Sequence, residues 1–69
     1  MIIRDLRIMQ EAEVLRDMTR KFVDALEQGE REFDDQFLID MKQSAGMLQT
    51  RLYVKLVEGG VITPRSKRV

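Results

Sequence analysis

The sequence predicts an all-α protein, folded as an antiparallel two-helix hairpin in a single domain that spans residues 1–69. Two stretches of more than 20 residues carry apolar side chains at spacings of three and four, which is the period of an amphipathic helix. Each stretch ends at glycine, a common helix stop. The connection between them is short, so the two helices are expected to lie side by side and run in opposite directions.

The first helix is expected from about residue 5 to residue 28. No glycine or proline interrupts this stretch until Gly29, which is well placed to end the helix. Glu11 also falls on the apolar face, where an acid is more often a satisfied edge residue than a functional group. The apolar face itself is formed by Ile8, Ala12, Leu15, Met18, Phe22, Ala25 and Leu26.

The second helix is expected from about residue 35 to residue 58, after a turn over residues 29–34. Asp34 is a candidate N-cap, and Phe33 before it is placed to pack on Leu38 in the first turn. Asp35 suits the positive end of the helix dipole. Gly59-Gly60 ends the helix and leaves a basic C-terminal tail over residues 59–69. The main apolar stripe consists of Leu38, Met41, Ala45, Leu48, Leu52 and Leu56.

The second helix carries more apolar surface than one neighbouring helix can cover. Its clearly polar arc is narrow and holds Asp40, Ser44, Arg51, Lys55 and Glu58. A lone hairpin buries one seam only, so we expect a homodimer that forms a four-helix bundle. Its core is expected to contain Leu15, Met18, Phe22, Leu26, Met41, Leu48, Leu52 and Leu56. The second apolar face, which is either the dimer seam or a groove for a partner, contains Ile39, Met47, Val54 and Val57.

Composition argues against catalysis and against cofactor or metal binding. The chain has no cysteine and no histidine, so it lacks thiol nucleophiles, the usual general base and the usual zinc ligands. The carboxylates do not follow the spacing of a calcium loop. No apolar run is long enough to span a bilayer and the N-terminus has no signal-peptide core. We therefore expect a soluble, cytoplasmic binding protein with no enzyme activity.

The turn between the helices is the first candidate binding surface. Residues 27–35 hold five acidic side chains against Arg31 alone, a local net charge of −4. One interpretation is a solvated loop with a capping aspartate. The other is an acidic knob that binds a basic protein surface, such as the DNA-reading face of a regulator, with an aromatic anchor. The candidate binding residues are Glu30, Glu32, Phe33, Asp34, Asp35 and Phe37.

Direct nucleic-acid binding is a competing hypothesis. Twelve basic and twelve acidic residues cancel over the chain, although Arg65, Lys67 and Arg68 make the last five residues basic. Such a tail is either a solubilising terminus or a weak, salt-sensitive phosphate contact. The exposed arc of the second helix mixes acids with bases, which disfavours a phosphate backbone. A third hypothesis is a structural helical adaptor, which predicts oligomers larger than a dimer.

The chain is short and has two helices around the Gly29–Asp34 turn and a short tail after Gly59-Gly60. In this organisation it resembles small helical proteins that phages and plasmids encode to redirect host regulators. Among these it is most similar to phage anti-quorum-sensing anti-activators. The resemblance implies binding to a host transcriptional activator of the quorum-sensing type, with its DNA-binding surface blocked. It also implies a possible second host target, such as a pilus-assembly motor. Inhibitors of host defence systems share the same organisation.

Overall fold

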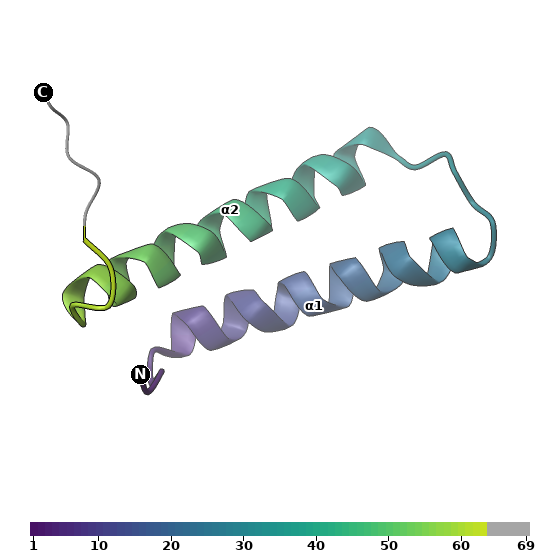
Figure 1. The fold of residues 1–69 in the computed structure, drawn as a ribbon. Helices are drawn as coiled ribbons and strands as arrows, with labels where there is room; N and C mark the ends of the chain where they lie inside the picture. Colours follow the sequence, from purple (N-terminus) through teal and green to yellow (C-terminus); the bar gives the residue numbers. More distant parts are fainter. Residues whose placement is uncertain (64–69) are drawn as a thin grey trace, which may run out of the picture.

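Two helices account for most of residues 1–63, the part of the chain that the computed structural model describes. Helix α1 spans Leu6–Glu27 and helix α2 spans Asp35–Glu58, and α2 runs back alongside α1 (Figure 1). No strand occurs among residues 1–63. The all-α hairpin predicted from the sequence is therefore confirmed, and the predicted helix ends agree with the observed ones to within one residue.

Both helices end in the same glycine-dependent motif. Gly29 has a φ of +93°, its N–H donates to the carbonyl of Leu26, and the N–H of Glu30 donates to the carbonyl of Ala25. This pair of bonds is a Schellman motif, which satisfies the last carbonyls of a helix and favours glycine because its φ is positive. The stop predicted at Gly29 thus has a clear physical cause.

At the end of α2 the positive φ, +72°, falls on Gly60 rather than on Gly59. The N–H of Gly60 donates to the carbonyl of Val57, and the N–H of Val61 donates to the carbonyl of Leu56. A Cβ on Gly59 would lie 3.0 Å from the Cε of Met1. The start of the chain therefore packs against the end of α2, at the open end of the hairpin.

The two helix starts are capped differently. Asp5 precedes α1, and its Oδ1 accepts a hydrogen bond of 2.8 Å from the backbone N–H of Arg7. Asp34 has the extended backbone of an N-cap residue, and its carbonyl accepts the N–H of Leu38, but its side chain makes no capping bond. Asp34 thus occupies the predicted position without making the expected side-chain contact.

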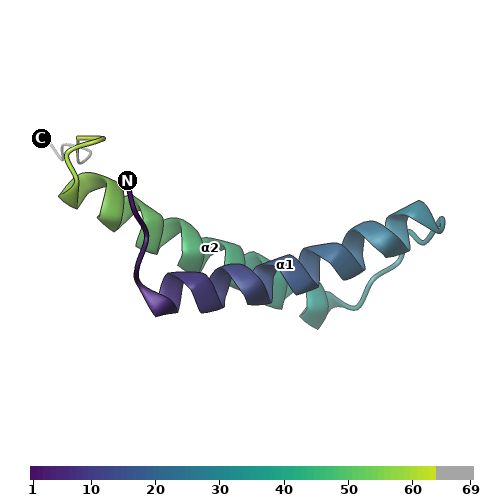
Figure 2. The same ribbon diagram turned by 90° about the horizontal axis from the view of Figure 1, so that it is seen from below.

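The interface between the helices is thin. Seen from below, the two helices cross each other at an angle, so that they meet closely over only part of their length (Figure 2). Within residues 1–63, only Ile8 is fully buried, with 5% of its surface exposed. The predicted core residues face the neighbouring helix but remain half-buried: Leu15, Met18, Phe22, Leu26, Met41, Leu48, Leu52 and Leu56.

The face that α2 turns toward α1 differs from the predicted one. Asp40, Ser44, Arg51 and Lys55 were expected to be exposed, yet all four are half-buried. Leu38 and Ala45, which belong to the predicted stripe, are instead exposed, as is Ala12 on α1. The contact face of α2 is therefore rotated away from the middle of the leucine stripe, toward its polar edge.

An ion pair between the helices explains part of this rotation. Arg51 Nε donates to Glu11 Oε1 at 2.8 Å, and the two side chains are 34% and 18% exposed. Glu11 lies on the apolar face of α1, where an unpaired carboxylate would be costly to desolvate. Turning Arg51 inward satisfies that carboxylate and turns the leucine stripe partly toward solvent. The interpretation of Glu11 as a satisfied edge residue is confirmed.

Candidate functional site

The acidic turn occupies the end of the hairpin opposite the start of α1 and the end of α2 (Figure 1). Glu30, Glu32, Asp34 and Asp35 are all exposed there. Arg31, the only base in this region, uses its Nη1 to donate to the carbonyls of Leu26 and Glu30, at 3.1 and 2.7 Å. Its guanidinium thus covers the negative C-terminal end of α1, and the carboxylates remain free of it. The result is a strongly acidic tip.

The two aromatic residues of this region lie differently from the expectation. The ring centroid of Phe33 lies 4.9 Å from that of Phe22 on α1, with the ring planes tilted by 58°. Both Phe33 and Phe37 are half-buried. Phe33 is therefore not the exposed aromatic anchor that the sequence predicts. Its ring ties the turn to α1, which holds the acidic tip in a defined position.

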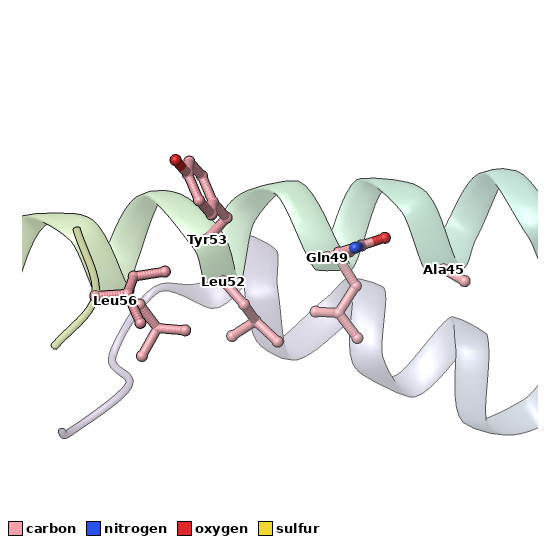
Figure 3. Close-up of a pocket in the computed structure, with 7 residues that line it drawn as sticks. Ala45, Gln49, Leu52, Tyr53 and Leu56 are labelled. Carbon is pink, nitrogen blue, oxygen red and sulfur yellow. The ribbon is translucent and has the colours of Figure 1, made fainter. Parts of the chain in front are cut away.

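A second candidate surface lies along one side of α2. We call it the leucine flank, and it surrounds an open hollow of about 420 Å³. Leu52 and Leu56 point toward α1, whereas Tyr53 points away from it and is 41% exposed (Figure 3). The leucine flank is lined by Ala45, Leu48, Gln49, Leu52, Tyr53, Leu56 and Ile62.

The opposite side of the hairpin carries a more mixed surface. Met47 of α2 and Val14 of α1 line one shallow hollow there, together with Gln10, Glu11 and Ser44. Met47 and Val14 are about half exposed. Of the predicted second apolar face, Ile39, Met47 and Val54 are exposed and Val57 is half-buried. This face therefore exists in the structure, but it is interrupted by polar groups.

Sequence reasoning missed Tyr53 and Ile62 as parts of one apolar surface. Tyr53 follows Ala45 and Gln49 at intervals of four, so it shares their side of the helix, but polar Gln49 interrupts the pattern. Ile62 reaches the hollow because the Schellman turn at Gly60 folds the chain back over Leu56. A hydrophobic residue soon after the Gly59-Gly60 stop was the available signal.

No group of three or more acidic side chains in residues 1–63 is arranged to hold a metal ion. Neither α1 nor α2 combines the length and hydrophobicity that a membrane span requires. The basic residues Arg65, Lys67 and Arg68 lie outside the described part of the chain.

Comparison with models of protein families, with curated proteins and with solved structures found no match to this chain. The functional assignment must therefore come from the surfaces themselves.

Proposed function

We propose that this chain is a small regulatory protein that acts by binding another protein rather than by catalysis. The observation that carries the proposal is the distribution of its apolar residues. Only Ile8 is buried among residues 1–63, whereas thirteen large hydrophobic side chains there are exposed. Exposed apolar surface that is continuous and bordered by polar groups is typical of protein–protein interfaces.

The acidic tip favours a target with a basic surface. A fixed cluster of carboxylates steers association with a positively charged partner and disfavours nucleic acid, which is itself negative. A DNA-reading surface is basic because it must bind phosphates. A DNA-binding surface is therefore the kind of target that the tip favours. The resemblance to phage anti-quorum-sensing anti-activators suggests that this target is a host transcriptional activator of the quorum-sensing type, whose DNA-binding surface the tip covers.

The test is competition for DNA. A purified quorum-sensing activator is bound to a fluorescent operator, and the chain is titrated into the complex while fluorescence anisotropy is followed. Release of DNA at stoichiometric concentrations supports the proposal. If the chain binds neither the activator nor its DNA-binding domain, this target is wrong.

Charge reversal shows whether the acidic tip is the contact. The triple variant Glu30→Lys, Glu32→Lys, Asp34→Lys should release DNA far less effectively. Its helix content should be unchanged, because none of these exposed side chains makes a hydrogen bond or ion pair within residues 1–63. A matched control reverses three exposed acids elsewhere, Glu13→Lys, Asp24→Lys and Glu58→Lys, and should keep its effect. Equal loss in both variants would point to net charge rather than to the tip.

A further inference from the structure

The leucine flank is mostly apolar, yet the hairpin covers it only in part. Its three leucines are only half-buried, and Ala45 and Tyr53 beside them are exposed. The hollow between these side chains is open to solvent, and Tyr53 at its edge points away from α1 (Figure 3). An unpartnered apolar face on so small a chain calls for a covering partner.

Residues of α1 extend this face. Leu48 on α2 and Leu15 on α1 mark the sides of the two helices that face each other. On a helical wheel, Leu52, Ala45 and Leu56 lie to one side of Leu48. Ala12 and Val23 lie to the same side of Leu15, counted in the same sense of rotation. In an antiparallel pair of helices, equal senses of rotation lead to the same side. The placement of Val14 and Met47 together on the opposite side agrees with this rule. The leucine flank is therefore part of a face to which both helices contribute, with Val23 of α1 lying beside the polar side chains of Arg16, Thr19 and Arg20.

We propose that a second copy of this chain covers the leucine flank, so that two hairpins form a closed four-helix bundle. A face two helices wide, with each helix about 10 Å across and about 33 Å long, measures roughly 700 Å². A standard stable interface takes about 800 Å² from each partner. The face is thus of the size that a homodimer needs.

Charge complementarity sets the orientation of the second copy. Residues 27–35 at the turn carry a net charge of −4, from five acids and one base. At the open end, residues 1–11 and 51–58 hold four bases and three acids, a net charge of +1, because Arg51 is paired with Glu11. A two-fold axis perpendicular to the helices places each acidic turn beside the basic open end of the other copy. An axis parallel to the helices would bring the two acidic turns together, which like-charge repulsion disfavours.

This arrangement goes beyond the binding role proposed above and does not depend on it. It places the seam on the leucine flank rather than on the face of Ile39, Met47, Val54 and Val57, and it leaves the two acidic tips at opposite ends of the dimer. Each tip would then be available to a separate target molecule.

Sedimentation velocity over a range of protein concentrations tests the seam. The wild-type chain should sediment as a dimer. Ala45→Glu places a charge on the flank at an exposed position, so it should retain helix content by circular dichroism and weaken dimerisation on the order of 100-fold or more. The matched control Met47→Glu adds the same charge at an exposed position on the opposite side and should remain a dimer.

Three outcomes would overturn the seam. A wild-type chain that stays monomeric shows that no second copy covers the flank, and one that forms larger oligomers shows an open assembly. Dissociation by Met47→Glu, with an intact Ala45→Glu dimer, moves the seam to the opposite side. None of these outcomes concerns the operator competition described above, so the two proposals fail separately.

Orientation is tested without any change to the flank. Because the chain has no cysteine, the single variant Glu32→Cys accepts one spin label, at the exposed acidic tip. Double electron–electron resonance should give a distance between the two spin labels of a dimer of roughly 35 Å or more, which is about the length of a helix. A distance within about 20 Å would place the tips together and would overturn the proposed orientation.

Discussion

Gly46 offers a sharp check on the geometry of α2. It lies in the middle of the helix, and a Cβ built on it would meet nothing within 4 Å. Glycine in a helix interior is less favourable than alanine by about 0.5–1 kcal/mol, because it loses more backbone entropy on folding. Because the added methyl group meets no other atom, the advantage of alanine is not offset by a steric cost. Gly46→Ala should therefore raise the free energy of unfolding by about that amount.

A change of this size is measurable in so small a chain. For domains of 60–100 residues, 1 kcal/mol corresponds to a shift in Tm of about 4–8 °C, so Gly46→Ala should raise Tm by roughly 2–8 °C. The assay is thermal unfolding followed by circular dichroism. Protein concentration must be the same for all variants, because the Tm of a dimer depends on it.

The matched control is the same substitution at Gly29. There φ is +93°, a conformation that alanine rarely adopts, so Gly29→Ala should lower stability by about 1–2 kcal/mol although its Cβ also meets nothing within 4 Å. One chemical change is thus expected to have opposite signs at two positions. A Tm that falls for Gly46→Ala would refute the reasoning, since it would mean that atoms of another chain occupy the space beside Gly46.

The remaining predictions concern caps and contacts, and each is measured by chemical unfolding at a fixed protein concentration. Asp5→Ala should lower the free energy of unfolding by about 1 kcal/mol because it removes a capping hydrogen bond. Asp34→Ala should lower it clearly less because the side chain of Asp34 makes no such bond. Equal losses in the two variants would contradict this difference. Arg51→Met should lower the free energy of unfolding by about 1–3 kcal/mol because it leaves the largely buried carboxylate of Glu11 without its partner. The loss of stability caused by Arg51→Met should be smaller in a chain that already carries Glu11→Gln. Phe33→Leu should cost on the order of 1 kcal/mol through loss of its ring contact; an unchanged midpoint would show that the turn is not held by that ring.

The helices and their ends were predictable because local chemistry determines them. Both stops depend on a glycine that can take a positive φ, and the bonds of the Schellman motif join residues within six positions of one another. Such signals are complete within a short window of sequence. The same holds for the acidic turn, whose carboxylates are exposed as charged side chains in a surface turn should be.

The orientation of α2 about its own axis was not predictable in the same way. Hydrophobic periodicity identifies only the most apolar side of a helix. For α2 it predicts that the centre of the leucine stripe is the face in contact with α1. The ion pair between Arg51 and Glu11 joins residues forty positions apart, so no local pattern reveals it. Phe33 shows the same limit, because its ring partner, Phe22, lies eleven positions earlier in the chain, on the other helix.

The rotation of α2 connects the fold to the proposed dimer. Had α2 turned its leucine stripe fully toward α1, the carboxylate of Glu11 would have faced apolar side chains without a partner, at a cost of several kcal/mol. With Arg51 turned inward, that carboxylate is satisfied, and Leu52 and Leu56 remain partly uncovered beside Tyr53. A polar contact inside the hairpin thereby leaves apolar surface outside it. Replacing both members of the ion pair with apolar residues of similar size should therefore favour burial of the stripe within one hairpin, at the expense of association between two.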